Sequence, residues 1–384
     1  MLRHVTGIRR LYDYRSLDSR ASLEVAIDAT NPDIVIPCDD RVVWQLHELY
    51  GRRPYLRSLI ESSLGSASQY GIVERRERLL EVAQALGIRV PETRLVGSEA
   101  DVRAWFETGP TRSVIKVDGT CGGTGVQIVD SEAGAIQALG RLARSAGLGT
   151  TVKRLLVNRD PLAIWTWQKH GQAPITIQRF IEGRPANAMF ACWRGEALGS
   201  VTVEVLSSEG ATGASVVVRV VENPEISHAI CALTRRLELT GFCGLDFVID
   251  GATGSANLIE MNPRCTQLGH LVLPGRGDLV GALCTRLLGR VQTEPGAPIA
   301  NEVVAFFPQS LLADPQSRFA GSAHLDVPWE HPDLVRELLL PPWPDRHWAA
   351  RLYHHFRPPR STPTVDFGDA RRMDVAETSG ARSS

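Results

Sequence analysis

The sequence predicts an α/β fold, because segments with helical and with strand periodicity alternate along its 384 residues. Residues 19–31 have the pattern of a helix, residues 32–40 form an apolar strand that ends in acids, and residues 41–51 are again helix-like. That order is the repeating unit of a doubly wound domain, here in a shortened form at residues 1–71. A later helix is indicated by apolar side chains on one face, at Ile226, Ile230, Leu233 and Leu237.

Composition limits the size and the partners of the protein. With 43% hydrophobic residues and 34 glycines, the chain can build a globular body of about two or three domains. Its 42 basic and 43 acidic residues give a net charge of −1, so we expect neither nucleic acid nor a membrane as a partner. The sequence lacks an apolar run of the ~18 residues that a transmembrane helix needs, and its amino terminus lacks the apolar region of a signal peptide. Seven dispersed cysteines without a C-x-x-C pair favour a reducing cytoplasm as the location.

Three side chains with metal-binding chemistry lie in residues 244–264, which have the pattern of one β-hairpin. If its turn is centred near Thr253, antiparallel pairing puts Asp246 opposite Glu260. Because strand side chains alternate between faces, Asn262 points the same way as Glu260 and shares its face with Asp246. Two carboxylates and one amide oxygen suit Mg²⁺, which completes its coordination with water and substrate phosphates. The alternative is a polar hairpin edge with its charges in water.

A glycine-rich loop joins two apolar strands within residues 112–129. Lys116 lies on the first strand, and the loop contains Gly119, Gly122, Gly123 and Gly125. Glycines permit close backbone approach, so the N–H groups of the loop can cradle phosphate oxygens while the lysine supplies a charge beside them. The Walker and dinucleotide motifs both lead into a helix, whereas these glycines join two strands, which suits a flap over a nucleotide. The alternative is a plain glycine-rich hairpin.

Together the two segments resemble the ATP-grasp superfamily. In that family a strand lysine or arginine precedes a glycine-rich flap, and an acidic or amide residue precedes a terminal E-x-N-P-R. The matching positions here are Lys116, the flap 118–125, Asp246, Glu260, Asn262, Pro263 and Arg264. The resemblance covers residues 31–290 and is closest to the branch of carbamoyl-phosphate synthetases and carboxylate–amine ligases. It implies two α+β subdomains that enclose a nucleotide cleft, preceded by the shortened doubly wound domain.

The resemblance also assigns residues around the nucleotide. Residues 73–93 resemble the family's opening helix, where Arg76 takes the place of a basic residue that contacts the triphosphate. The family carries one acidic residue at the hinge that binds adenine and another nearby, whereas this chain has Gln178, Arg179 and Ile181 at the hinge, with Glu182 as the only acid. Backbone groups around Phe180 can still read the adenine edge, because a strand offers an N–H and a C=O whatever its side chains. The alternative for Glu182 is a solvated turn residue.

The activity implied by the resemblance is that of an ATP-dependent ligase. Such an enzyme activates a carboxylate as an acyl phosphate and joins it to an amine, with release of ADP and phosphate. The implied cofactors are ATP and two Mg²⁺ ions, with Mn²⁺ as the alternative metal. Asp246, Glu260 and Asn262 would hold the metals, with Glu260 between them.

Four basic residues complete the implied site. Lys116 and Arg76 would hold the α- and β-phosphates, and Arg264 would stabilise the transferring phosphoryl group through its planar fork. Arg219, on an apolar strand after the loop 209–215, is a second candidate for that role. The alternative for Arg219, which the sequence supports equally, is a surface arginine on a strand with no role in the site.

The expected partners are a small-molecule carboxylate and an amine, and a homodimer is the expected assembly because many relatives are dimers. Thr266, Gln267 and His270 follow the E-x-N-P-R motif and can contact these substrates. His270 has the chemistry of a general base, and a histidine that caps local backbone is the alternative. Two other functions use the same site: a carbamoyl-phosphate-forming or kinase-like enzyme, and a nucleotide-binding protein with degenerate catalysis. A carboxylase is less favoured, because the sequence shows no biotin-attachment motif.

The predicted organisation has four parts: the shortened domain 1–71, the ATP-grasp domain 72–290 with a flap subdomain at 111–183 and a metal-bearing core at 184–290, a small region 291–356 and a disordered tail 357–384. Residues 301–310 of the small region have the pattern of a strand. Relatives carry a further strand and helix before the first domain. We therefore expect either a short variant or a start methionine inside a longer reading frame.

Overall fold

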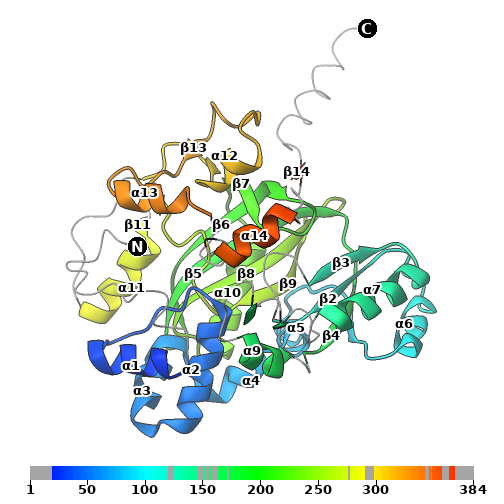
Figure 1. Ribbon diagram of the computed structural model, residues 1–384, viewed down its shortest axis with the longest axis horizontal. Coiled ribbons are helices and arrows are strands. Elements are labelled where there is room, and N and C mark those ends of the chain that lie inside the picture. The colour runs from blue at the N-terminus through cyan, green and yellow to red at the C-terminus, as the bar shows by residue number, and fades with distance from the viewer. Residues whose placement is uncertain are drawn as a thin grey trace.

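The structure is a computed structural model, and it describes residues 20–119, 125–145, 151–152, 155–156, 163–170, 173–275, 277–289, 298–341, 346, 348–356 and 363–367. Two β-sheets with helices packed against them form most of this part of the chain (Figure 1). The larger sheet lies at the centre of the molecule, and the smaller one lies to one side of it. The α/β fold class is thus confirmed.

The large sheet has eight strands among the described residues, in the order β13-β12-β7-β6-β5-β8-β9, with β14 paired to β6. Its long strands are β5 (Gly183–Trp193), β6 (Glu196–Glu209) and β8 (Gly241–Asp250), which pair antiparallel. The others are β7 (Ser215–Val220), β9 (Ala256–Asn262), β12 (Val303–Ala305), β13 (His324–Leu325) and β14 (Thr364–Asp366). Strand β12 confirms the strand predicted within residues 301–310.

Helices cover both faces of this sheet. Because strand residues alternate, Phe190 points to one face, where α5 (Arg76–Ala85) and α10 (Pro224–Arg236) complete the core. Helix α10 begins after an Asn223 cap and buries Ile226, Ile230 and Leu233, which confirms the helix predicted there. Met189 points to the other face, against α11 (Leu279–Leu288).

The small sheet has the order β1-β4-β2-β3, formed by β1 (Thr93–Leu95), β2 (Ser113–Val117), β3 (Val126–Val129) and β4 (Ile175–Arg179). Helices α6 (Glu99–Phe106) and α7 (Glu132–Ser145) pack on it, and their core contains Trp105, Ile115 and Leu142. Strands β2 and β3 are antiparallel, so the glycine-rich loop joins two strands as predicted. Residues 120–124 of that loop lie outside the described residues.

One hydrogen bond in this core gives a stability test. Trp105 and Ser113 are fully buried, and Nε1 of Trp105 donates to Oγ of Ser113 at 2.9 Å. Ser113→Ala would leave a buried donor without its acceptor, so we expect the free energy of unfolding to fall by about 1–3 kcal/mol in urea denaturation. The exposed Ser227→Ala is the matched control, with an expected change within about 0.5 kcal/mol. Equal stability of both variants would contradict this expectation.

The amino-terminal region is helical, with α1 (Arg20–Thr30), α2 (Asp40–Arg52), η3 (Pro54–Leu56), α3 (Arg57–Leu64), η4 (Ala67–Gln69) and α4 (Tyr70–Val73). The strand predicted at residues 32–40 is wrong, since this segment forms no ladder with any residue that the structure describes. Its backbone groups form hydrogen bonds with other segments. The Val35 N–H donates to Ser63 Oγ at 2.9 Å, and the Pro37 carbonyl accepts from the Cys265 N–H at 2.9 Å. The two prolines of the segment lack the N–H groups that a regular ladder needs.

The remaining elements are α9 (Ala163–His170), β10 (Val272–Leu273), β11 (Gly277–Asp278), α12 (Gln309–Ala313), α13 (Pro332–Leu338) and α14 (Trp348–Phe356). Residues 363–367 are the described part of the tail, and the disorder expected for them is wrong, because β14 pairs with residues 207–209 of β6. Strand β5 pairs with β6 only as far as Glu204, which leaves the backbone groups beyond it for β14. No helix within the described ranges is long and apolar enough for a membrane span.

Candidate functional site

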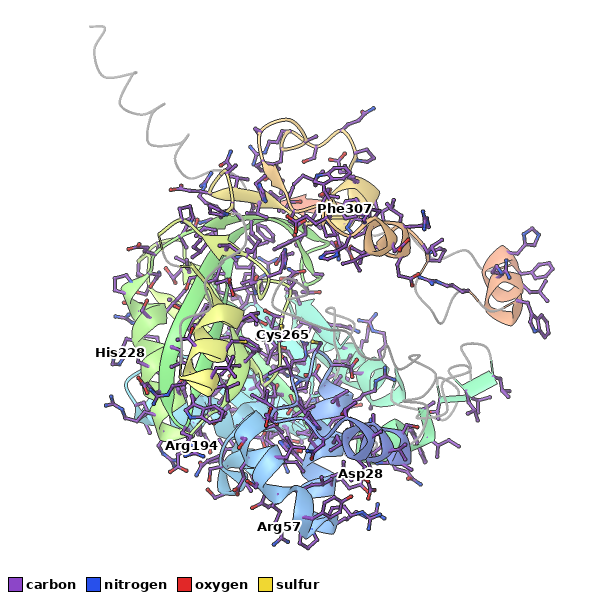
Figure 2. The ribbon with its side chains drawn as sticks, turned by 90° about the vertical axis from the view of Figure 1, so that its left-hand side faces the viewer. Asp28, Arg57, Arg194, His228, Cys265 and Phe307 are labelled. Carbon is purple, nitrogen blue, oxygen red and sulfur yellow. The ribbon has the colours of Figure 1, made fainter. Side chains whose placement is uncertain are left out.

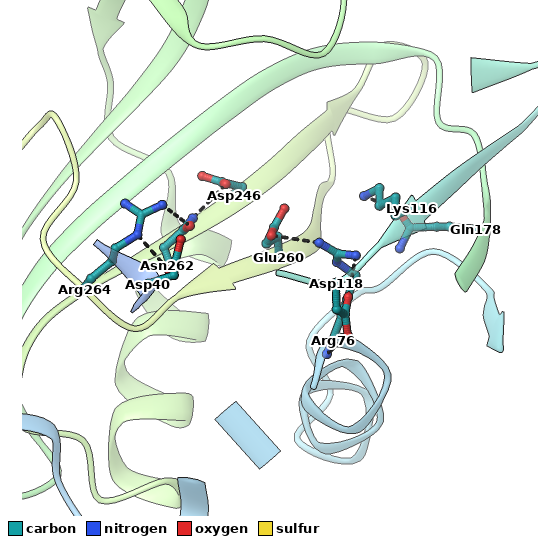
Figure 3. A network of polar contacts seen from close by, with 9 residues as sticks. All are labelled: Asp40, Arg76, Lys116, Asp118, Gln178, Asp246, Glu260, Asn262 and Arg264. Carbon is teal, nitrogen blue, oxygen red and sulfur yellow. Dashed lines mark hydrogen bonds and ion pairs between the residues drawn. The ribbon is translucent and has the colours of Figure 1, made fainter. Parts of the chain in front are cut away.

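A cavity of about 420 Å³ opens where the two sheets meet the amino-terminal helices. Its wall combines segments that are far apart in the sequence: the start of α2, the start of α5, the residues after β2, the loop 212–214 with the start of β7, and the hairpin β8–β9. Six of the residues predicted for the nucleotide, the metal or catalysis line it, namely Arg76, Gly119, Asp246, Glu260, Asn262 and Arg264. Figure 3 shows the polar contacts that hold most of them.

The hairpin β8–β9 has the predicted register. Asp246 pairs with Glu260, and Gly244 pairs with Asn262. Glycine fits position 244, because a Cβ there would lie 2.6 Å from Cγ2 of Thr266. The three candidate metal ligands therefore share one face of the hairpin, and that face forms part of the cavity wall.

Asp246 is half-buried and hydrogen-bonded at both carboxylate oxygens. Its Oδ1 accepts from Nδ2 of Asn187 at 2.7 Å, and its Oδ2 accepts from Nδ2 of Asn262 at 3.0 Å. Burial, and then the charge of Glu260, raise the pKa of Asp246 to about 6. Sequence reasoning did not assign Asn187 to this site, because its contact with Asp246 depends on the pairing of β5 with β8.

Arg76, the first residue of α5, is buried and bridges two carboxylates. Its Nη1 lies 2.7 Å from Oδ1 of Asp118, and its Nη2 lies 2.8 Å from Oε1 of Glu260. Burial acts to raise the pKa of Glu260, but the charges of Arg76 and Lys116 outweigh it and hold this pKa below its usual range. Asp118 is the first residue of the predicted flap 118–125, two residues beyond Lys116, but no role was predicted for its side chain.

Lys116 lies behind the cavity wall, buried on β2. Its Nζ donates to Oε1 of Gln178 at 2.8 Å, and Nε2 of Gln178 donates to Oγ1 of Thr93 at 2.9 Å. Burial, and then the positive charge of Arg76, lower the pKa of Lys116 to about 8. The Nζ contact is with a neutral amide, so an anion that entered the cavity would attract this ammonium group.

The other predicted hinge residues lie just beyond β4. The Phe180 N–H donates to the carbonyl oxygen of Arg112 at 3.3 Å, and the Arg112 guanidinium lies 4.1 Å from the Phe180 ring centroid. Glu182 is exposed and forms an ion pair with Arg112 at 2.8 Å. Ile181 is half-buried between them. None of these lines the cavity of about 420 Å³, and their adenine contacts stay a prediction.

The glycines of the flap are only partly described. Gly119 lines the cavity with a φ of +74°, a conformation that favours glycine. The Gly125 carbonyl accepts from the Val117 N–H at 3.0 Å and closes the described end of the hairpin. Gly122 and Gly123 lie outside the described residues.

Arg264 connects the hairpin to helix α2. Its Nε lies 2.8 Å from Oδ1 of Asp40, and its Nη2 donates to Oδ1 of Asn262 at 3.1 Å. Asp40 was not predicted, because this contact joins residues 224 positions apart. The guanidinium therefore lies at the cavity wall beside the candidate metal ligands.

Arg219 lies away from Arg264 and the candidate metal ligands. Its register partner Glu204 pairs with Ala186, which packs in the core with α5 and α10. Because side chains alternate, Arg219 faces the opposite side of the sheet from Asn187. There it lines a second cavity of about 760 Å³ together with Arg184 and Glu204.

The residues after Arg264 extend the cavity. Thr266 and Gln267 line it, and Nε2 of Gln267 donates to the Ser215 carbonyl at 3.3 Å. His270 lies farther along, with Nε2 2.8 Å from Oδ2 of Asp326. Its described partner is thus a side-chain carboxylate and not the local backbone.

The donor set fits a hard divalent cation. Asp246 and Glu260 face each other across the hairpin, and the raised pKa of Asp246 reflects burial and the repulsion that such a cation relieves. No group of three histidine, cysteine, aspartate or glutamate side chains suited to a metal occurs among the described residues, so the set is two carboxylates and an amide oxygen. That composition matches Mg²⁺, which takes few protein ligands and completes its shell with water and phosphate.

Comparisons with known proteins agree with this geometry. Residues 78–267 match the model of an ATP-grasp domain. The chain is 25% identical over 216 residues to the carbamoyl phosphate synthase large chain of Thermus thermophilus, an alignment that covers 56% of this chain and 20% of that protein. The chain thus spans about a fifth of the length of that curated relative.

Solved structures share the fold. The biotin carboxylase domain of Hydrogenobacter thermophilus 2-oxoglutarate carboxylase, a dimer in complex with MgADP, ADP and bicarbonate, has a TM-score of 0.51 at 13% identity, over 72% of this chain and 58% of that chain. An N5-carboxyaminoimidazole ribonucleotide synthetase in complex with ADP has a TM-score of 0.52 at 14% identity, over 73% of this chain and 67% of that chain. Residues 78–267 of this chain therefore form an ATP-grasp domain.

Proposed function

We propose that this chain is an ATP-dependent ligase that activates a carboxylate as an acyl phosphate and joins it to an amine. The observation that carries the proposal is the pairing of Asp246 with Glu260 at the wall of a cavity that Arg76 and Arg264 also line. Opposite charges thus meet where a triphosphate and a carboxylate would have to approach each other. Charged groups gathered around a cavity with shifted pKa values are typical of functional sites.

Asp246, Glu260 and Asn262 would hold Mg²⁺, in two sites with Glu260 shared, and Mn²⁺ would suit the same oxygen donors. Bound there, the metal would neutralise phosphate charge during in-line transfer. Asn187 would orient Asp246 through the 2.7 Å bond to its Oδ1.

The remaining residues act on the substrates. Arg76 and Lys116 would bind the α- and β-phosphates, and Arg264 would bind the oxygens of the transferred phosphoryl group. A carboxylate oxygen attacks the γ-phosphorus, the bond to the β-phosphate oxygen breaks, and ADP leaves. The amine nitrogen then attacks the acyl carbon, phosphate leaves and the nitrogen loses a proton. Thr266 and Gln267, which line the cavity beyond Arg264, would contact the carboxylate or the amine.

A carbamoyl-phosphate-forming enzyme is the second candidate. The 25% identity to the carbamoyl phosphate synthase large chain favours it, and the same residues would serve. It would release a phosphorylated product without an organic amine, so the two candidates differ in their products.

Lys116 gives a pH test of the phosphate site. Its pKa of about 8 means that the ammonium charge is present below that pH and is lost above it. We therefore expect the affinity for MgATP to fall between about pH 8 and pH 10, with proton uptake on binding at pH 9, because a bound triphosphate favours the charged amine. Isothermal titration in buffers of different ionisation enthalpy measures both effects. Lys116→Arg keeps its charge and should remove the proton uptake, whereas unchanged uptake in that variant would exclude Lys116 as its source.

The ligase proposal is tested by trapping. The protein is incubated with ATP, Mg²⁺, pooled small carboxylates and hydroxylamine, an amine that converts acyl phosphates into hydroxamates. Hydroxamate that requires ATP, Mg²⁺ and the carboxylate pool would support the ligase. Carbamoyl phosphate formed from bicarbonate and ammonia would favour the second candidate instead.

A further inference from the structure

The buried carboxylate of Asp118 has no role in the chemistry described so far. It lies at the cavity wall directly before Gly119, and only 8% of the residue is exposed. Burial raises the pKa of Asp118, and the charge of Arg76 opposes that rise. Burying a carboxylate costs free energy that pairing with a cation often does not fully offset. The burial of Asp118 beside Arg76 therefore calls for a structural or functional reason.

Asp118 holds Arg76 at both ends of that residue. Its Oδ1 lies 2.7 Å from Nη1 of Arg76, and its Oδ2 accepts from the Arg76 backbone N–H at 3.3 Å. Arg76 is the first residue of α5, and the side chain of Arg75 at the N-cap accepts no hydrogen bond from the backbone N–H groups of the first turn. Asp118 therefore replaces the missing local cap from a distant segment and fixes the guanidinium with the same carboxylate.

The fixed guanidinium reaches the metal-binding hairpin. Nη2 of Arg76 lies 2.8 Å from Oε1 of Glu260, as Figure 3 shows. Nε of Arg76 is buried without a hydrogen-bond partner among the described residues, so the contacts at Nη1 and Nη2 set the orientation of the group. An arginine side chain has several rotatable bonds, and holding it in one conformation costs entropy that Asp118 offsets before any ligand arrives.

We propose that Asp118 is a positioning residue that acts through Arg76. Asp118 orients the guanidinium toward Glu260 and toward the expected position of the triphosphate. It contacts neither the nucleotide nor the metal itself. The proposal rests on the ATP site of the proposed function.

The test is a double-mutant cycle on MgATP affinity, measured by isothermal titration on the full chain. Asp118→Ala should weaken MgATP binding by about 10–100-fold, as the loss of groups that orient a ligand-binding side chain does. Asp118→Asn keeps the shape but loses the charge, and its single amide oxygen can accept from only one of the two Arg76 groups. It should therefore fold as the wild type does and lose less affinity than Asp118→Ala. In an Arg76→Ala background, Asp118→Ala should have no further effect, because the residue through which it acts is gone.

Asp101→Asn is the matched control. Asp101 belongs to the exposed capping box of α6 in the same part of the molecule and lies outside the cavity wall. It should bind MgATP as the wild type does. If the losses of MgATP affinity from Asp118→Ala and Arg76→Ala were additive in the double variant, the positioning role would be overturned. Wild-type affinity in both Asp118 variants would do the same, and neither result would affect the proposed nucleotide site. A wild-type chain that binds no MgATP would overturn the nucleotide site and this role together.

Discussion

Glu260→Gln is expected to lower carboxylate-dependent ATP turnover by about 10²–10³-fold, because metal-assisted charge stabilisation is worth several kcal/mol. Glutamine keeps the shape of the side chain and can still accept the hydrogen bond from Nη2 of Arg76, so the fold should persist. The charge that would hold the metal is lost. Steady-state turnover at saturating ATP and Mg²⁺ measures the effect, with thermal unfolding as the check on folding.

The matched control is Glu196→Gln on β6. Glu196 lies in the same sheet, forms an exposed ion pair with Arg286 at 2.8 Å and does not line the cavity. Exposed pairs contribute at most about 1 kcal/mol, so turnover should not change. Wild-type turnover in Glu260→Gln would exclude the hairpin β8–β9 as the site of a catalytic metal.

Arg264→Ala is expected to lower kcat by about 10²–10³-fold with little change in MgATP affinity, since a group that stabilises transferring charge acts mainly in the transition state. Its guanidinium now contacts Asp40 and Asn262 at the cavity wall, so it needs little movement to meet a phosphoryl group. Arg264→Lys keeps the charge but loses the planar fork and should recover only part of the rate.

Arg336→Ala serves as the control for removing an arginine. Arg336 is 75% exposed on α13 and pairs with Asp333 at 2.8 Å. Its loss should leave kcat unchanged. If Arg264→Ala instead raised the KM for ATP with an unchanged kcat, Arg264 would be a ground-state binding residue and not a stabiliser of transfer.

The sequence predicts the parts of the site that depend on local geometry. The pairing of Asp246 with Glu260 follows from one turn and the alternation of strand side chains, so the structure reproduces it. The strand–glycine loop–strand around Lys116 was predictable for the same reason. The role of Arg76 at the triphosphate was predicted only from the family resemblance, because no local pattern around this helix indicates it.

The remaining contacts depend on tertiary packing. Asp118 reaches Arg76 across 42 positions, and Asn187 reaches Asp246 across 59, so no local pattern indicates either pair. Arg219 lies on a predicted strand, but the register of that strand with Glu204 turns its side chain away from Asn187. The apolar run at residues 32–40 has strand composition, yet its prolines and its contacts with α3 and Cys265 keep it out of both sheets.

The measurement that tests the central claim most directly is ATP turnover with Mg²⁺ and a pooled panel of carboxylates and amines, resolving ADP, AMP, phosphate and pyrophosphate. The account predicts ADP and phosphate, formed only when the carboxylate pool is present, and division of the pool would then identify the substrate. AMP and pyrophosphate would contradict the acyl-phosphate mechanism.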